Sequence, residues 1–381
     1  MDIIALLFAL LRHAACGEKL TDETINACTA QNLEQVYTLA KKHDLAHLVA
    51  HAVEGLDLLP CELLDMLKKE KVTAIYRYTR LDLEFARICS ILEQAVIPFL
   101  PLKGSVLRPL YPEGWMRSSC DIDVLVRPET LQDAVTHLEK AGYRRKGKGH
   151  HDVSLYSPSG VHLELHYRLT DQADPEPVRK ALDTVWENAE RKQGTSNHHL
   201  MTDGYFYLYH MAHMANHFLR GGCGIRACLD IWVMNHLVTR NTAERETLLA
   251  QCGLLAFANA AEMLADYWFS GRTPDPQTLH FAECVLNGGI YGAKDNGAAL
   301  QKAADTKLRI PFRRILIPME DLRYSYPILD KKPWLMPLCQ VLRWLRLGGI
   351  LCGVLKKHAA AQKISQDTER KTRQLLQYLQ L

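Results

Sequence analysis

Hydrophobic positions recur at helical spacing through the first part of the chain. Apolar residues that recur at three- and four-residue spacing, with polar residues between them, include Leu33, Val36, Leu39, Ala40, Leu81, Leu83, Phe85, Ile88 and Leu92. This spacing places the apolar side chains on one face of an α-helix. We therefore predict an N-terminal helical segment over residues 1–96.

The pattern changes at Ile97, where short apolar runs alternate with turn-forming residues. We predict strands at 97–102 and 120–126, a helix at 131–141, and a hairpin formed by strands at 152–157 and 161–169 around Pro158-Ser159-Gly160. This mixed α/β unit spans residues 97–169. After a linker at 170–177 the helical spacing returns, apart from expected loops at 191–204, 270–279 and 285–297. We assign residues 170–381 to a larger all-helical C-terminal domain.

The composition is that of a soluble globular protein. Hydrophobic residues make up 48% of the 381 residues, which is enough for a core and excludes disordered and collagen-like classes. The 11 cysteines are scattered without a C-x-x-C pair, so we expect reduced thiols in a cytoplasmic protein. The apolar stretch at residues 3–11 follows Asp2 and is too short to span a bilayer, so we expect neither a secretory signal nor stable membrane insertion.

Two aspartates interrupt the apolar strand predicted at 120–126. Asp121 and Asp123 are two residues apart, and on a strand both carboxylates therefore project from the same face. Like charges held together destabilise each other unless a cation lies between them. Mg²⁺ prefers oxygen ligands of this kind, although a solvent-facing strand with two unrelated aspartates fits the same pattern.

Two neighbouring segments favour the metal-binding interpretation. Lys103-Gly104-Ser105 lies at a strand-to-helix transition, where a glycine lets a phosphate approach the backbone and a serine can donate to its oxygens. In the second hairpin strand, alternation places one polar set on a single face: His162, Glu164, His166 and Arg168. Glu164 beside the two aspartates would complete a cluster of three carboxylates that can hold two Mg²⁺ ions.

These segments together resemble the nucleotidyltransferase superfamily of the DNA polymerase β type. The motifs are Lys103-Gly104-Ser105, Arg117-Ser-Ser-Cys-Asp121-Ile-Asp123-Val-Leu-Val and Leu163-Glu164-Leu-His166-Tyr-Arg168. More narrowly, the chain is similar to a bacterial family of uncharacterised nucleotidyltransferases with the pattern L-K-G, R-x-x-x-D-h-D-h-L-V and h-D/E-L-H-W-R. The segment 45–49, the helical segment with His210, His213, His217, Arg226 and Asp230, and the block at 317–346 also resemble that family.

The resemblance implies an α+β fold with a minimal nucleotidyltransferase mixed sheet. It implies Mg²⁺-dependent transfer of a nucleoside monophosphate from an NTP, with ATP expected, and release of pyrophosphate. Asp121, Asp123 and Glu164 would be the catalytic and metal-binding residues, and Lys103, Gly104, Ser105 and Arg117 the nucleotide-binding residues. The acceptor stays open between a small molecule, a protein side chain and an RNA end. Two other interpretations are a catalytically idle nucleotide-binding regulator or toxin-like adaptor on the same scaffold, and a protein-binding helical scaffold.

Residues of the second hairpin strand and of the C-terminal helices are candidates for the cleft. We name His166, Arg168, His213, His217, Arg226 and Asp230 as substrate-cleft candidates. His210, His213 and His217 share a helix face, which fits packing, substrate contact or a zinc site. Arg226 and Asp230 are four residues apart and are expected to form a structural ion pair. The alternative for Arg226 is contact with the triphosphate.

The net charge of +3 conceals an uneven distribution. Residues 301–381 contain 16 Lys+Arg and 6 Asp+Glu, a net charge of +10, whereas residues 1–300 carry 30 and 37, a net charge of −7. The C-terminal helices and a predicted basic loop at 144–151 are consistent with solvated surfaces. Contact with anionic lipid, RNA or phosphates is the alternative for these segments.

Overall fold

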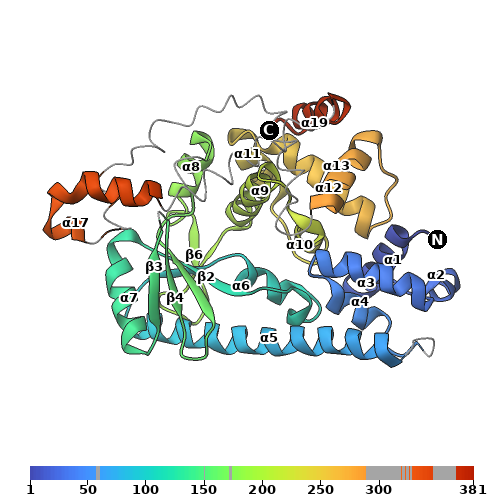
Figure 1. The fold of residues 1–381 in the computed structure, drawn as a ribbon, viewed down its shortest axis with the longest axis horizontal. Coiled ribbons are helices and arrows are strands. Elements are labelled where there is room, and N and C mark those ends of the chain that lie inside the picture. The colour runs from blue at the N-terminus through green and yellow to red at the C-terminus, as the bar shows by residue number, and fades with distance from the viewer. Residues whose placement is uncertain are drawn as a thin grey trace.

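The computed structural model describes residues 1–56, 61–149, 151–170, 174–288, 319, 322, 326, 328–345 and 366–381. The N-terminal part is helical, as predicted. Its elements are α1 (Ile3–Cys16), α2 (Asp22–Ala27), α3 (Ala30–Lys42), α4 (Ala46–Ala52) and α5 (Cys61–Gln94). Side-chain caps begin three of them, because Asp2, Thr21 and Thr29 each accept a hydrogen bond from a backbone N–H in the first turn. Helix α5 has 34 residues and runs along one side of both the sheet and the other N-terminal helices (Figure 1).

The central sheet has five strands in the order β1-β2-β5-β4-β3. The strands are β1 (Phe99–Pro101), β2 (Asp121–Val126), β3 (Arg144–Lys148), β4 (Asp152–Tyr156) and β5 (His162–His166). Strands β2 and β5 are parallel and the other pairs are antiparallel, so the predicted mixed sheet of an α+β fold is confirmed. Between the strands lie α6 (Gly104–Leu107), α7 (Leu131–Lys140) and the short 3₁₀ turns η1 (Arg108–Leu110), η2 (Gly114–Met116) and η3 (Pro128–Thr130).

The two faces of the sheet have different environments. Ile122, Val124 and Leu163 are buried in one hydrophobic cluster with residues of α5 and α7. Because side chains alternate along a strand, Asp121, Asp123 and Glu164 project from the opposite face. Leu125 on that face belongs to the other, larger hydrophobic cluster, which contains the N-terminal and C-terminal helices.

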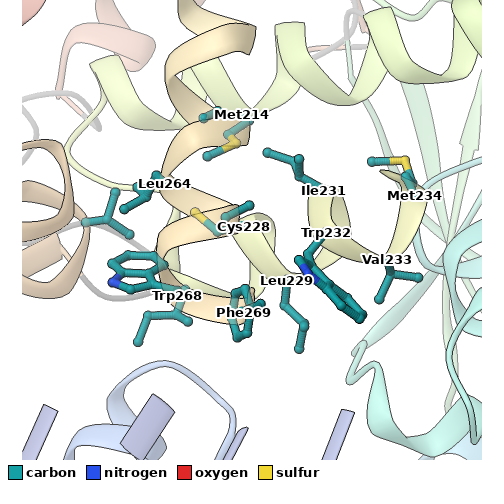
Figure 2. Packing of buried hydrophobic residues seen from close by; sticks show 14 of the residues in the cluster. Met214, Cys228, Leu229, Ile231, Trp232, Val233, Met234, Leu264, Trp268 and Phe269 are labelled. Carbon is teal, nitrogen blue, oxygen red and sulfur yellow. The ribbon is translucent and has the colours of Figure 1, made fainter. Parts of the chain in front are cut away.

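The C-terminal helices and α1 share this larger core. Its helices are α8 (Glu176–Asp183), α9 (Asp203–Leu219), α10 (Gly224–His236), α11 (Thr242–Gln251), α12 (Leu255–Phe269), α13 (Pro276–Gly288) and α19 (Gln366–Leu379). Figure 2 shows residues of α9, α10 and α12 packed together, among them Met214, Cys228 and Leu264. Phe8 of α1 stacks on Trp268 of α12 with ring centroids 4.7 Å apart. The N-terminal and C-terminal helices therefore share one hydrophobic core. The division of the chain into domains at residues 96 and 169 stays a prediction.

Two segments expected to be loops contain strands. Residues 144–148 form the edge strand β3, whose five residues are all exposed and have no apolar alternation to signal a strand. Positive charge on an edge strand discourages pairing with other chains. Residues 189–191 and 199–201 form the small sheet β6 (Ala189–Arg191) and β7 (His199–Met201). Its turn is bonded to the end of α5, because the Glu93 carboxylate accepts hydrogen bonds from the N–H groups of Asn197 and His198.

Most of the basic C-terminal region lies outside the described residues, whereas most of the block at 317–346 lies within them. The described part contains α17 (Ile328–Lys331), η4 (Pro333–Leu335) and helical residues 336–345. Leu329 and Cys339 of these elements form a small separate hydrophobic cluster with Leu322. Across the described ranges, no helix has the length and apolar character needed to cross a membrane.

Candidate active site

The three predicted carboxylates lie on two adjacent parallel strands. Asp123 of β2 is directly opposite Glu164 of β5, and Asp121 is opposite His162. Two groups of side chains share Glu164 and have all their ligand atoms within 4.8 Å of one another: Asp121, His162 and Glu164, and Asp123, Glu164 and His166. Ligands bound to a divalent ion at roughly 2.1 Å lie at most about 4.2 Å apart, so shifts of a few tenths of an ångström would bring either group around an ion.

Asp123, Glu164 and His166, the inner group, are accompanied by a cation of the protein itself. Lys103 Nζ lies 2.7 Å from Asp123 Oδ1 and 3.9 Å from Glu164 Oε2. His166 Nε2 lies 2.9 Å from the same Asp123 oxygen. Burial would raise the pKa of Asp123, which is 2% exposed, but Lys103 and His166 outweigh burial and hold this pKa well below its ordinary value. Asp123 is therefore a carboxylate at neutral pH.

The pKa of Lys103 and the pKa of His166 follow from the same carboxylates. Burial would lower both values, but the negative charges of Asp123 and Glu164 raise the pKa of Lys103, and hydrogen bonds to these two carboxylates raise the pKa of His166. Lys103 is thus an ammonium ion at the place where a metal cation would neutralise the inner group. The Lys103 backbone has φ 44°, an uncommon conformation for a residue with a side chain. Conformations of this kind gather at functional sites.

Asp121, His162 and Glu164, the outer group, are half-buried. Burial and the neighbouring Asp123 charge raise the pKa of Asp121. Among the described residues Asp121 has no ion-pair partner within 4 Å, so its charge is less compensated than that of Asp123. The outer group has the electrostatic character of a site that a cation stabilises.

The Gly104-Ser105 turn is packed against arginine side chains. A Cβ atom at Gly104 would lie 2.3 Å from Ser119 Oγ and 2.9 Å from Arg108 Nη1, so any larger residue would require these side chains to move. Ser105 is buried, and its hydroxyl lies 3.4 Å from Arg108 Nη2. Both residues are thus in a crowded turn next to Lys103, and their predicted contact with phosphates stays a prediction.

Arg108 was missed by the sequence reasoning. It is 3% exposed, and its Nη1 has no hydrogen-bond partner among the described residues. Burial and the nearby Arg117 charge lower the pKa of Arg108 to about 10. A signal was present in the sequence, because Arg108 follows Ser105 by three residues at the start of a predicted helix and so shares its face.

Arg117 and Asp230, both predicted site residues, are bonded to each other. Arg117 Nε and Nη2 lie 3.2 Å and 3.0 Å from the Asp230 carboxylate oxygens, and the Tyr111 hydroxyl donates to the same carboxylate at 2.7 Å. Arg117 Nη1 donates to the Ser118 carbonyl and the Ser119 hydroxyl. The predicted contact of Arg117 with nucleotide stays a prediction, and the observed contacts join the chain before β2 to helix α10.

The expected pair of Arg226 with Asp230 is wrong. Arg226 Nη1 lies 3.2 Å from Asp44 Oδ2 and donates to the Ser118 carbonyl, whereas Asp230 is bonded by Arg117. The i, i+4 spacing permits the pair, but the buried Arg117 guanidinium offers Asp230 two parallel hydrogen bonds from another segment.

Helix α9 places further candidate residues near the acidic groups. The pKa of His213 is held well below its ordinary value by burial and by the Lys103 charge, and the His213 and His217 rings are 4.4 Å apart. Neither residue belongs, with His210, to a metal-ligating group among the described residues, so nothing there supports the zinc interpretation. Arg168 lies two residues beyond the end of β5 and is exposed, because the observed strand is shorter than the strand predicted at 161–169.

Comparison with known proteins agrees with this geometry. A family model described as an uncharacterised nucleotidyltransferase matches residues 29–270, which include the whole five-stranded sheet and helices α9 to α12. No curated protein and no solved structure matches the chain. The family match ends before the block at 317–346, so the resemblance of that block is not part of it. The predicted family is confirmed: the chain belongs to the uncharacterised nucleotidyltransferase family and is an enzyme that transfers nucleotidyl groups.

Proposed function

We propose that the enzyme transfers a nucleoside monophosphate from an NTP, with ATP as the expected donor, to an acceptor and releases pyrophosphate. The observation that carries this proposal is the cluster of three carboxylates on parallel strands β2 and β5, beside a turn that contains two cationic side chains. Carboxylates supply metal ligands, and the cations fit the charge of a triphosphate.

The donor atoms of both groups fit divalent metal ions. Asp121, Asp123 and Glu164 would hold the ions, and we expect two Mg²⁺. When bound, Mg²⁺ would neutralise phosphate charge and make an acceptor hydroxyl easier to deprotonate. Lys103 already pairs with Asp123, so it would leave this carboxylate when an ion is bound and would then be free to contact a phosphate.

Arg108 and Ser105 are suited to the phosphates of the donor. A buried guanidinium that has no ion pair within 4 Å among the described residues is costly for the folded protein, and a phosphate group would supply the missing acceptors. Ser105 lies within reach of the same guanidinium and offers a hydroxyl to the same group. We propose that these two residues, with the backbone of Gly104, hold the β- and γ-phosphates.

Glu164 and helix α9 are suited to the acceptor. Glu164 is the more exposed of the two inner carboxylates, with a side chain 28% exposed against 3% for Asp123, and we propose it as the base or metal ligand nearest the acceptor. His213 has a lowered pKa and is therefore neutral at pH 7, so it can accept a hydrogen bond from an acceptor hydroxyl.

A labelling experiment tests this function. Wild-type enzyme and the D121N/D123N variant are incubated with Mg²⁺, cell extract and each α-labelled NTP in turn. We expect label in an acceptor with wild type and none with the variant, and the chemical class of the labelled product identifies the acceptor. Labelling that persists in D121N/D123N would contradict the proposed function.

A further inference from the structure

The outer group differs from the inner group by an imidazole that is open to the site. His162 lies opposite Asp121 in the parallel pairing of β2 with β5, and its ligand atom is within 4.8 Å of the Asp121 and Glu164 oxygens. His162 precedes the segment 163–168 that resembles the family, so the carboxylate motif alone does not include it. His166, by contrast, is buried and bonded to Asp123.

Neighbouring side chains fix the orientation of the His162 ring. Its Nε2 atom lies 2.8 Å from Ser154 Oγ on the adjacent strand β4. The ring also stacks on Tyr156, with centroids 4.9 Å apart and planes inclined by 24°. When the serine hydroxyl accepts the Nε2 proton, the Nδ1 lone pair is left for a cation. Histidine ligands of metals are commonly held in this way by a hydrogen bond at the other ring nitrogen.

The two groups also differ in the cation that the protein provides. Lys103 Nζ is 2.7 Å from Asp123 in the inner group, whereas Asp121 of the outer group has no ion pair among the described residues. Glu164 lies 3.9 Å from Lys103 and 3.5 Å from His166, farther than Asp123 lies from either residue. With Asp121 free of an ion pair in the described part of the chain and an oriented imidazole beside it, the outer group is the better site for an ion in the absence of nucleotide.

We propose that Asp121, His162 and Glu164 form a metal site that takes a divalent transition-metal ion such as Mn²⁺ in preference to Mg²⁺. Mg²⁺ favours oxygen ligands, whereas first-row transition-metal ions also bind imidazole, and Mn²⁺ shares with Mg²⁺ the affinity for carboxylates, so the imidazole is what distinguishes the two ions here. The inference rests on the proposed function and replaces the expected Mg²⁺ with a transition-metal ion at one of its two metal positions. It does not require turnover, since binding involves the side chains of this chain alone.

Metal titrations of the full chain without nucleotide test this site. Free Mn²⁺ is followed by its electron paramagnetic resonance signal, with and without competing Mg²⁺, for wild type, H162Q and S154A. The control variant is H199Q, which alters a half-buried histidine outside both groups. We expect H162Q to lower Mn²⁺ affinity at least about tenfold, with Mg²⁺ affinity unchanged. We expect a smaller loss of Mn²⁺ affinity in S154A and none in H199Q.

Unchanged Mn²⁺ affinity in H162Q, or an equal loss for Mn²⁺ and Mg²⁺, would overturn the inference. If H162Q does not fold, S154A decides the question, because unchanged Mn²⁺ affinity there would overturn the orienting role on which the site depends. The experiments distinguish a failure of the metal assignment from a failure of the proposed function. Selective Mn²⁺ binding without nucleotidyl transfer would overturn only the proposed function, and transfer without selective binding would overturn only the metal assignment.

Discussion

Arg117 and Asp230 form a buried ion pair between the segment that precedes β2 and helix α10. Their closest atoms, Nη2 and Oδ2, are 3.0 Å apart, and the two side chains are 10% and 2% exposed. Burial would raise the pKa of Asp230, but the Arg117 charge outweighs it and lowers this pKa. The pair therefore stays charged at neutral pH and fixes the carboxylate strand against the C-terminal helices.

Removing one charge of this pair is predicted to destabilise the protein strongly. D230N leaves the Arg117 guanidinium buried without its anion, which costs about 3 to 5 kcal/mol in the free energy of unfolding. D44N is the matched control, because it breaks the half-buried pair with Arg226 and is expected to cost about 1 kcal/mol or less. Urea denaturation at pH 7 measures both, and equal losses in the two variants would refute this account of Arg117.

Replacing Lys103 is predicted to separate metal binding from nucleotide binding. The Lys103 ammonium competes with a metal ion for Asp123, so K103M should bind Mg²⁺ more tightly than wild type in the absence of NTP, by roughly tenfold. The same variant should lose nucleotidyl transfer, because a cation that contacts phosphate is gone. Calorimetric titration with Mg²⁺ measures the first effect, with K103R as a charge-conserving control. Weaker Mg²⁺ binding by K103M would show that Lys103 does not compete with the ion.

Arg108 is predicted to reduce stability while it serves binding. R108M removes a buried charge that has no ion pair within the described ranges, so its free energy of unfolding should rise by about 1 to 3 kcal/mol. Its affinity for NTP in the presence of Mg²⁺ should fall at least about tenfold, because a charged hydrogen bond to phosphate is lost. Thermal unfolding and a fluorescence titration with a non-hydrolysable NTP measure the two effects. A variant that binds the analogue as tightly as wild type would exclude Arg108 from the phosphate site.

His43 is predicted to make the fold sensitive to mild acid. Its ring is fully buried between α3 and the C-terminal helices, and Nδ1 accepts a hydrogen bond from the Ile225 N–H. Burial lowers the pKa of His43 to about 4, below its ordinary 6.5. The unfolded chain therefore binds a proton first as the pH falls, so the contribution of His43 to stability is complete above pH 6.5 and decreases towards pH 4.

The expected loss from His43 is about 2 kcal/mol between pH 7 and pH 5. H43N keeps an acceptor near Ile225 but does not titrate, so its free energy of unfolding should fall less than that of wild type over this range. Urea denaturation at the two pH values measures the difference. Identical pH dependence in the two proteins would show that His43 does not titrate in this range.

The parts of the site that follow from local patterns could be predicted from the sequence. The period of two along a strand places Asp121 and Asp123 on one face, and the same rule selects Glu164 and His166 from the hairpin. The strand-to-helix transition at Lys103-Gly104-Ser105 is likewise a local signal. The parallel pairing of β2 and β5 aligns the strand residues, and Lys103 meets them through its ion pair with Asp123.

The partners of the charged residues could not be predicted, because tertiary packing selects them. Arg117 meets Asp230 across 113 positions of the chain, so no spacing rule applies. The i, i+4 rule instead suggested Arg226 for Asp230, and a buried guanidinium from another segment displaced it. The edge strand β3 was missed for another reason: all its residues are exposed, so its sequence has no apolar alternation.

The fate of the two ends of the triphosphate tests the central claim most directly. Wild-type enzyme is incubated with Mg²⁺, cell extract and ATP labelled either at the α-phosphate or at the γ-phosphate. Nucleotidyl transfer predicts that the α-label enters the acceptor while the γ-label is recovered as pyrophosphate, and that both products are absent with D121N/D123N. A γ-label that enters the acceptor, or an α-label that stays with ADP or ATP alone, would contradict the account.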